Sequence, residues 1–288
     1  MPSVSEIRHR IRSVKETQQI TKAMHLISVS RMRKAIAQYS MNAVYWDKVR
    51  TTMKDILIHG GCVKHPFLQL SHKPGARTTF IIVTADKGLA GSYNHDVLKL
   101  AERKIQECEA PNIITVGSVG WDYFTHKGYM VDMEFMHVVQ NPSLYNAQRI
   151  MEALVDLYSH GLMDEVYVIF TRLQSNVHME PTAVRLLPVL LEDFADVAAP
   201  ENHGNITYEP SPQEVLSILV PQYLEGMLYS MLVQSNAAEH RSRMLAMDTA
   251  TRNADEMLED LNQKYNQARQ ARITSELSDI IGGMQGGQ

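Results

Sequence analysis

The chain has few cysteines and no long uninterrupted apolar run. Its two cysteines, Cys62 and Cys108, lie far apart among 288 residues, which excludes a disulfide framework and is typical of a reducing compartment. No stretch approaches the roughly 20 consecutive apolar residues that span a bilayer, and the N-terminus has no apolar signal core. We therefore expect a soluble protein with no direct membrane insertion, which reaches a membrane only through a partner.

Helix breakers are missing from both ends of the chain. Neither Pro nor Gly occurs from Ser3 to His59 or from Met227 to Ile281. Inside a helix, Gly costs about 1 kcal/mol and Pro about 3 kcal/mol, so each run predicts one long helix. The predicted organisation is an N-terminal coiled-coil helix (residues 1–59), a central α/β domain (60–212) and a C-terminal coiled-coil helix (213–288).

Both predicted helices have start signals. Ser3-Val4-Ser5-Glu6 and Ser211-Pro212-Gln213-Glu214 each have the spacing of a capping box, and the second has Pro at the first helical position. Pro221 lies inside the second helix, where we expect a kink or a local irregularity.

The two long helices are predicted to pack together. At about 1.5 Å per residue each would extend roughly 80–85 Å, which is more than a compact domain of this size can cover. Along the first run, alternating steps of four and three meet ten apolar residues at fifteen positions, typical of a heptad seam. These positions are Ile7, Ile11, Val14, Gln18, Thr21, His25, Ser28, Met32, Ala35, Tyr39, Asn42, Trp46, Val49, Met53 and Ile56. A similar seam in the second run consists of Val215, Leu219, Gly226, Tyr229, Val233, Met247, Ala250, Ala254, Met257, Leu261, Ala268 and Ala271.

The pairing predicts a long antiparallel coiled coil. The two runs flank one central segment, and the small residues of the second seam would let the helices approach closely. The polar section Gln18, Thr21, His25 and Ser28 is unusual in a structural seam, and we expect it to mark where the pair loosens or meets another molecule. The alternative is that both helices fold onto a globular core.

The central segment has a different pattern. Apolar, β-rich stretches alternate with helical patterns, which predicts a Rossmann-like, mostly parallel sheet with covering helices. The predicted strands are Thr79–Thr84, Asn112–Gly117, Met130–Met136, Glu165–Thr171 and Ala183–Leu190. The predicted helices are Asn94–Glu107, Val119–Lys127 and Ser143–His160, the last after an Asn141-Pro142-Ser143 turn.

No motif for chemistry stands out. The loop Thr84–Asn94 follows the first strand, where such sheets bind ligands, but it lacks the glycine spacing of dinucleotide-binding and phosphate-binding loops. We expect a structural turn or a partner contact there, with a nucleotide site as the alternative. His59, Cys62 and His65 are spaced three apart, but no second pair has zinc spacing. The sequence predicts no catalytic residues, no cofactor and no metal.

Positive charge is concentrated in the first helix. Residues 1–59 contain 11 Lys and Arg against 4 Asp and Glu, whereas residues 60–212 contain 11 against 18 and residues 213–288 contain 6 against 10. The basic face either complements the acidic second helix or meets acidic protein surfaces. No aromatic residues interleave these charges, so we do not expect nucleic acid to bind.

Several segments of the sequence are similar to those of a known protein family. The sequence resembles the γ subunit of bacterial-type F-type ATP synthases from end to end, most specifically near its C-terminus. The segments that carry the resemblance are Ile20–Met24, Ser30–Lys34, Val83–Gly91, Arg243–Asp248 and Ala268–Leu277.

The resemblance implies a central rotor subunit without catalytic activity of its own. Such a coiled coil turns inside a hexamer of three α and three β subunits, and the α/β domain rests on the membrane c-ring beside the ε subunit. The implied location is the cytoplasmic face of a bacterial plasma membrane, with the coupling ion, H⁺ or Na⁺, chosen elsewhere in the complex. By the same resemblance, Arg269 and Gln270 contact β, and Lys22 and Met24 face its acidic lever segment. Seam packing is the alternative for Met24.

Two other functions compete with this interpretation. One is an enzyme that binds a nucleotide at Asp86–Asn94 and uses its helices to oligomerise. The other is a passive coiled-coil tether.

Overall fold

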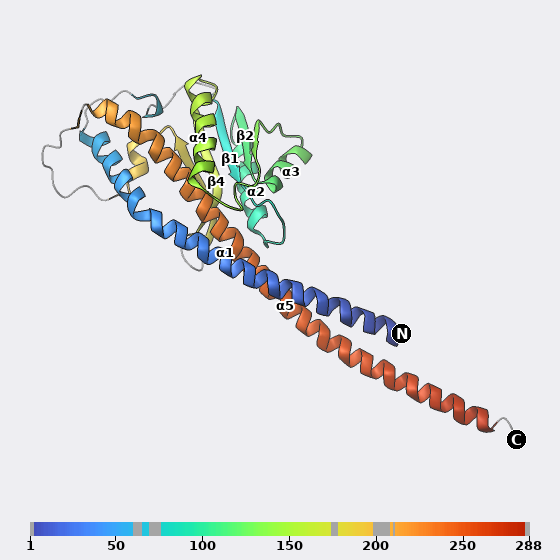
Figure 1. The fold of residues 1–288 in the computed structure, drawn as a ribbon. Helices are drawn as coiled ribbons and strands as arrows, with labels where there is room; N and C mark the ends of the chain where they lie inside the picture. Colours follow the sequence, from blue (N-terminus) through green and yellow to red (C-terminus); the bar gives the residue numbers. More distant parts are fainter. Residues whose placement is uncertain are drawn as a thin grey trace. The chain divides into compact units, whose positions relative to one another are not determined.

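The protein consists of two compact units. The computed structural model describes residues 3–59, 65–68, 76–173, 178–197, 208–209 and 211–285. Unit 1 comprises residues 1–29 and 243–288, and unit 2 comprises residues 30–242. Helices α1 (Val4–His59) and α5 (Pro212–Gln285) contribute to both units (Figure 1). The predicted three-part division follows the ends of these helices and stays a prediction, whereas the compact units are defined by contacts.

Both long helices begin at the predicted residues, with a complete capping box in the first and one of its two bonds in the second. The backbone N–H of Ser3 donates to Glu6 Oε2 over 2.8 Å, and that of Glu6 donates to Ser3 Oγ over 3.2 Å, so the first capping box is complete. At the start of α5, the N–H of Glu214 donates to Ser211 Oγ over 3.3 Å. These bonds satisfy N–H groups that a helix leaves without partners in its first turn.

Helix α5 is long and partly apolar. It passes through Pro221 without ending, so this proline is accommodated inside the helix. By length and composition alone, this is the one helix of the described residues that could cross a membrane, over Pro212–Ser278. Half of its most apolar window is buried within the chain, and core helices meet the same criteria.

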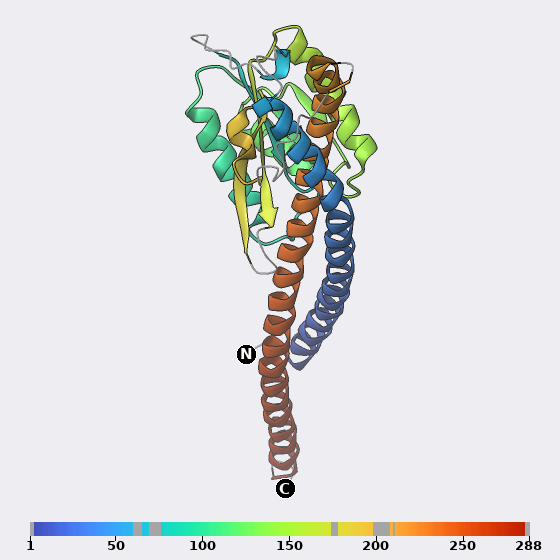
Figure 2. The ribbon, with the colours of Figure 1, turned by 90° about the vertical axis from the view of Figure 1, so that its left-hand side faces the viewer.

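Unit 1 is an antiparallel pair of helical segments. As residue numbers increase along α1, the residues that they contact on α5 have decreasing numbers, so the two segments run in opposite directions (Figures 1 and 2). Arg8 donates to the hydroxyl of Tyr265 over 2.8 Å, Gln18 donates to Asp255, and the hydroxyls of Thr21 and Thr251 lie 2.8 Å apart. The predicted antiparallel coiled coil is therefore confirmed.

The seam of unit 1 follows the predicted positions closely along α1 and less closely along α5. Ile7, Thr21 and Ser28 are buried on α1. On α5, Met257 was predicted for the seam but is exposed, and Ala271 is exposed as well. Within unit 1, the apolar side chains buried on α5 are Met247, Ala254, Leu258 and Leu261. The seam therefore keeps heptad spacing but uses Leu258, one residue after the predicted position.

Unit 2 contains a five-stranded sheet in the order β3-β2-β1-β4-β5. The strands are β1 (Thr78–Val83), β2 (Pro111–Val116), β3 (Met133–Phe135), β4 (Glu165–Leu173) and β5 (Met179–Leu187). Strand β1 pairs in parallel with β2 and β4, β2 pairs in parallel with β3, and β4 and β5 are antiparallel. The predicted mostly parallel, Rossmann-like sheet is confirmed.

Helices cover both faces of this sheet (Figures 1 and 2). Because side chains alternate along a strand, β1 sends Phe80 and Ile82 to one face and Ile81 and Val83 to the other. Helices α2 (Tyr93–Gln106) and α3 (Ser118–His126) pack on the first face, and α4 (Leu144–Ser159), with parts of α1 and α5, packs on the second.

The element bounds differ from the predicted ones mainly at two strands. Strand β3 is limited to Met133–Phe135, whereas β5 starts at Met179. The early start of β5 has a physical reason, because Met179 pairs with Leu173 at the far end of β4 and closes the hairpin. The predicted turn into α4 is confirmed by Ser143, whose side chain accepts a hydrogen bond from the N–H of Asn146.

Candidate partner interface

Lys22 and Met24 lie next to the polar part of the seam in unit 1. Thr21 is buried, and the next side chain, Lys22, is exposed and forms no ion pair with any described residue. Met24 is half-buried, and its carbonyl accepts a hydrogen bond from the buried Ser28 hydroxyl over 2.8 Å. Lys22 is thus exposed to solvent, whereas the side chain of Met24 is partly covered, so both the partner contact and the seam packing of Met24 stay predictions.

Arg269 and Gln270 lie farther along α5. Both are exposed, as is every residue from 269 to 278. The guanidinium of Arg8 lowers the pKa of Tyr265 through a hydrogen bond, and the positive charge of Arg269 adds to the effect. Thr21, the neighbour of Lys22, contacts Thr251 across the seam. From Thr251 to Arg269, helix α5 extends for about 27 Å at 1.5 Å per residue, and this length separates the two predicted pairs. They form two levels of contact and not one site.

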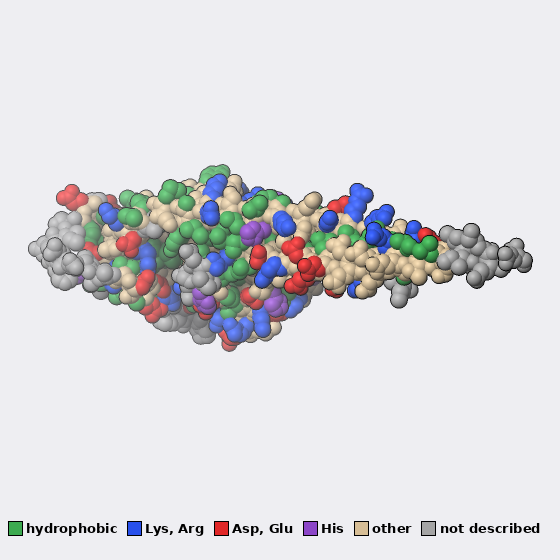
Figure 3. Space-filling model, turned by 90° about the horizontal axis from the view of Figure 1, so that it is seen from below, with side chains coloured by type: hydrophobic (Ala, Val, Ile, Leu, Met, Phe, Trp, Pro, Cys, Tyr) green, Lys and Arg blue, Asp and Glu red, His purple; other side chains and the backbone are tan. Residues whose placement is uncertain are grey.

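Unit 1 also exposes large apolar side chains, which the sequence analysis did not single out. On α1, Ile20, Leu26 and Ile27 are 60%, 67% and 54% exposed. On α5, the exposed apolar residues of this unit are Leu245, Met257, Ile273 and Leu277. In the face drawn in Figure 3, apolar side chains likewise reach the surface between basic and acidic ones. Apart from Met257, these residues lie outside the predicted heptad positions, and that was the signal in the sequence. Their exposure is typical of a protein-binding surface.

The loop after β1 is a structural turn. Thr84 is buried, and its Oγ1 accepts a hydrogen bond from the N–H of Gly120 over 2.9 Å. The side chain of Asn94 accepts from the N–H of Ala85 over 2.9 Å, and Ser118 Oγ donates to the carbonyl of Asp86 over 3.0 Å. The polar groups of the loop are largely satisfied inside the chain, which supports the predicted structural turn over a nucleotide site.

The same loop is fixed to helix α5. The hydroxyls of Tyr93 and Ser235 lie 2.7 Å apart in a buried contact, and Ser242 Oγ donates to the carbonyl of Ala90 over 2.6 Å. Leu89, at the tip, has a left-handed backbone (φ 60°) and is 67% exposed. Unit 2 therefore holds this tip rigidly and presents an apolar side chain to solvent.

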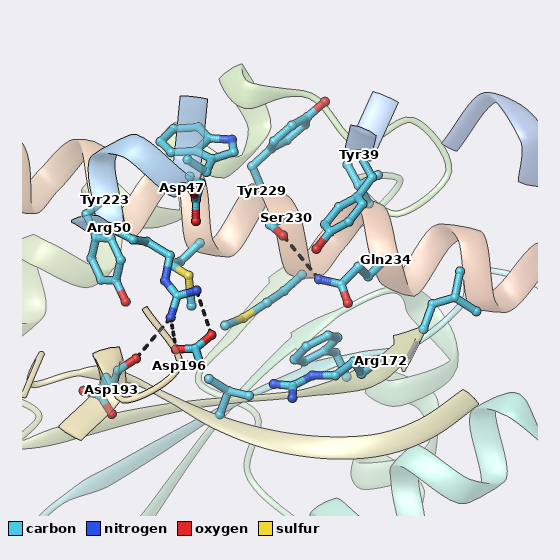
Figure 4. Close-up of a pocket in the computed structure, with 18 of the residues that line it drawn as sticks. Tyr39, Asp47, Arg50, Arg172, Asp193, Asp196, Tyr223, Tyr229, Ser230 and Gln234 are labelled. Carbon is cyan, nitrogen blue, oxygen red and sulfur yellow. Dashed lines mark hydrogen bonds and ion pairs between the residues drawn. The ribbon is translucent and has the colours of Figure 1, made fainter. Parts of the chain in front are cut away.

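A cavity of about 880 Å³ lies between α1, α5 and strands β4 and β5 (Figure 4). Arg50 spans part of it and donates to both carboxylate oxygens of Asp196, over 2.6 and 3.0 Å, and to the carbonyl of Asp193. The bond from Arg50 lowers the pKa of Asp196 below its ordinary value. Tyr223, also in the lining, has its pKa raised to about 12, mainly by burial. The arrangement ties the segment after β5 to α1.

The described residues do not test whether His59, Cys62 and His65 come together. Cys62 lies outside them. His59 Nδ1 lies 3.0 Å from Asp55 Oδ1, whereas the ring of His65 packs on Phe67, and burial lowers the pKa of His65. Within the part of the chain that the structure describes, no group of three His, Cys, Asp or Glu side chains is placed to hold a metal ion.

Comparison with known proteins identifies the family. The family model described as ATP synthase matches residues 3–286. The ATP synthase γ chain of Caldanaerobacter subterraneus is 44% identical over 290 residues, covering 96% of this chain and 98% of the relative. That of Ruminiclostridium cellulolyticum is 42% identical over 286 residues, covering 98% and 97%. The chain belongs to the ATP synthase γ-chain family.

Solved structures agree with the fold of this γ-family chain. A chain in the Euglena gracilis mitochondrial ATP synthase, solved as OSCP/F1/c-ring in rotational state 3, matches with a TM-score of 0.68 at 16% identity. The match covers 98% of this chain and 94% of that one. A chain of the Tetrahymena thermophila central stalk and c-ring matches with a TM-score of 0.60 at 20% identity, over 80% and 99% of the two chains. At these identities the likeness establishes the fold.

Proposed function

We propose that this γ-family chain is the central rotor of an ion-translocating F-type ATP synthase. It would couple rotation of the membrane c-ring to conformational changes at catalytic sites on the β subunits, in synthesis or hydrolysis of ATP. The catalytic groups would belong to those partners, and this chain would act mechanically. The observation that carries the proposal is the antiparallel helix pair of unit 1, with a closed seam and a surface that exposes both basic and apolar side chains.

A paired shaft suits torque better than a single helix. The buried seam joins the two helices by apolar contacts and by the polar contacts of Arg8, Gln18 and Thr21. Twisting one helix therefore has to move the other. One asymmetric chain inside three equivalent β subunits would press each of them differently, so the three catalytic sites would pass through different states.

The outward side chains supply the proposed contacts with the hexamer. Lys22 is exposed and carries a charge suited to an acidic lever segment on β, with Met24 beside it. Arg269 and Gln270 are proposed to contact β at a second level of the shaft. Exposed charged pairs contribute about 0–1 kcal/mol each, so these contacts are weak enough to be made and broken in each turn.

The remaining partners follow from the same proposal. We place the ε subunit and the c-ring against unit 2, and the complex at the cytoplasmic face of a bacterial plasma membrane. In support, relatives 42–44% identical are bacterial γ chains, and the fold matches a chain from a solved central stalk and c-ring. The ion, H⁺ or Na⁺, would be selected by the membrane part.

Reconstitution tests the rotor function. The full chain is combined with α and β subunits and membrane sector in vesicles, and ATP hydrolysis and ion-driven ATP synthesis are measured. Lys22→Glu replaces an attraction with a repulsion of about 1 kcal/mol, so we expect a several-fold loss of coupled activity. Lys99→Glu, at an exposed position of α2, is the matched control. Unchanged activity and coupling in Lys22→Glu would remove that contact from the proposal.

A truncation tests the shaft as a whole. Removing residues 273–288 deletes the chain beyond the predicted seam, of which residues 273–278 are exposed. The rotor proposal predicts weakened assembly or coupling, whereas a passive tether would keep full partner activity. Binding of ATP to the isolated chain at micromolar affinity would favour an enzyme instead.

A further inference from the structure

A second cavity, of about 370 Å³, lies in unit 2 and has no counterpart in the proposed function. One helical face of α1 lines it with Arg31, Lys34 and Gln38, and one face of α5 lines it with Asn236 and His240. The turn between β3 and α4 closes the third side. Residues from three distant parts of the sequence therefore converge on one small hollow.

The charge in this cavity is positive. Arg31 and Lys34 are exposed, and neither forms an ion pair with any described residue. No Asp or Glu is among the residues that line the cavity. His137 also lines it, and its Nδ1 lies 3.8 Å from an oxygen of Asp86, the nearby carboxylate. Two cations one helical turn apart repel each other, and an anion between them would remove that repulsion.

The frame around the charges is fixed. Ala35 forms part of the lining on α1 and is 1% exposed. Asn236 is buried and donates to the carbonyl of Val139 over 2.6 Å, which holds the turn against α5. His240, also buried, brings an imidazole to the wall. A site whose walls are already in position loses little conformational entropy when a ligand enters.

We propose that this cavity binds a phosphate-type oxyanion, held by Arg31 and Lys34 and enclosed by polar groups of the β3–α4 turn and α5. Small-molecule pockets range from about 300 to 1,000 Å³, and this one is near the lower limit, so it has room for inorganic phosphate. The bound anion links α1, the turn and α5. It therefore stabilises unit 2 by an amount that rises with the logarithm of its concentration above the dissociation constant.

Binding to the full chain tests this site directly. The line width of the ³¹P resonance of inorganic phosphate is measured with increasing protein, and thermal unfolding is followed in sodium phosphate and in sodium chloride of equal ionic strength. We expect broadening of the resonance and a rise in the unfolding temperature with the logarithm of phosphate concentration, and neither effect with chloride. Arg31→Gln and Lys34→Gln should each weaken phosphate binding at least tenfold.

Arg33→Gln is the matched control, since Arg33 is an exposed cation on the same helix that does not line the cavity. It should bind phosphate as the unchanged chain does. The same two measurements are made with ADP in place of phosphate. If ADP binds the unchanged chain and neither Arg31→Gln nor Lys34→Gln, the site is supported and its phosphate group comes from a nucleotide.

Three results would overturn the proposal. One is an equal response to phosphate and chloride, and another is phosphate binding that survives in both Arg31→Gln and Lys34→Gln. The third is binding of a glutamate-rich peptide without any response to phosphate or ADP, which would make the cavity a docking point for a protein. If one variant fails to fold, the other still decides, because each removes one of the two cations.

Discussion

The hydroxyl groups of Thr21 and Thr251 lie 2.8 Å apart across the seam of unit 1. Each hydroxyl also lies within hydrogen-bonding distance of a carbonyl of its own helix, Thr21 at 3.0 Å from that of Gln18 and Thr251 at 2.8 Å from that of Met247. Since each hydroxyl has one proton, one of the two threonines donates across the seam and the other donates within its own helix. The polar section, which we expected to mark where the pair loosens or meets another molecule, is thus hydrogen-bonded between the helices at Gln18 and Thr21. Directional bonds of this kind fix the register of a seam, whereas apolar contacts tolerate slippage.

Removing this pair should weaken unit 1 in a non-additive way. We expect Thr21→Val or Thr251→Val alone to lower the free energy of local opening by about 0.5–1.5 kcal/mol, the net contribution of one hydrogen bond. The double variant should cost no more than the larger single change, because both hydroxyls are then absent. Hydrogen–deuterium exchange of peptides covering residues 11–28 and 247–261 measures these effects.

Thr17→Val is the control for the threonine pair. Thr17 is exposed on the same helix, and its hydroxyl bonds only to the carbonyl of Ser13 in the described structure. We expect no change in exchange beyond a few tenths of a kcal/mol. Simple addition of the two single effects in the double variant would contradict a direct bond.

Gly226 and Trp46 confirm the expected close approach of α1 and α5 within unit 2. A Cβ atom on Gly226 would overlap the indole ring of Trp46. In an open helix, Gly→Ala gains about 1 kcal/mol, but here we expect a net loss of about 1–3 kcal/mol from overpacking. Urea denaturation followed by tryptophan fluorescence and circular dichroism measures the change.

A second substitution separates overpacking from other causes. Trp46→Leu should make Gly226→Ala harmless or stabilising, because the ring is then gone. Gln222→Ala, at an exposed position of the same helix, gives the effect of helix propensity alone. A Gly226→Ala variant as stable as the unchanged chain would show that the helices can move apart freely.

Gly117 is required at the end of β2. Its φ of 102° is unfavourable for other residues, and a Cβ would press on the backbone of Thr84. We expect Gly117→Ala to destabilise unit 2 by about 3 kcal/mol or more, since strain and overlap add. Gly128 has a φ of 81° and open space around it, so Gly128→Ala should cost only about 1–2 kcal/mol. Equal losses in the two variants would contradict the close approach.

Helix and strand order could be predicted because local signals agreed with the tertiary structure. The capping box at Ser3 and Glu6 and the N-cap at Ser143 act within one turn, so their partners are visible in the sequence. The error at Met257 has a different origin. Met257 and Leu258 are both apolar, and only the partner helix decides which of them is buried.

The surface features were harder to predict than the fold. Lys22 and Arg269 came from a family resemblance, since one exposed cation looks like any other in a single sequence. The contact of Arg50 with Asp196 and the cavity beside Arg31 depend on residues that are far apart along the chain. No periodicity encodes such contacts. They become visible only when the sheet and the long helices are in place.

Tyr223 should make the folded chain sensitive to alkaline pH. Its side chain is 4% exposed and packs on Phe194 with ring centres 5.3 Å apart. Burial is the main reason why its pKa is raised from 10 to about 12. Between these values the unfolded chain releases the phenol proton while the folded chain keeps it. The free energy of unfolding therefore falls as pH rises from about 10 to about 12, by about 1–2 kcal/mol from this group.

Tyr223→Phe keeps the ring and removes the proton, so its unfolding free energy should depend less on pH in this window. Urea denaturation at several pH values from 9 to about 12 gives the comparison. Tyr145→Phe is the control, because Tyr145 is 68% exposed. Its pH dependence should match that of the unchanged chain. If Tyr223→Phe and the unchanged chain lose stability in parallel, the Tyr223 hydroxyl is not held in its neutral form by burial.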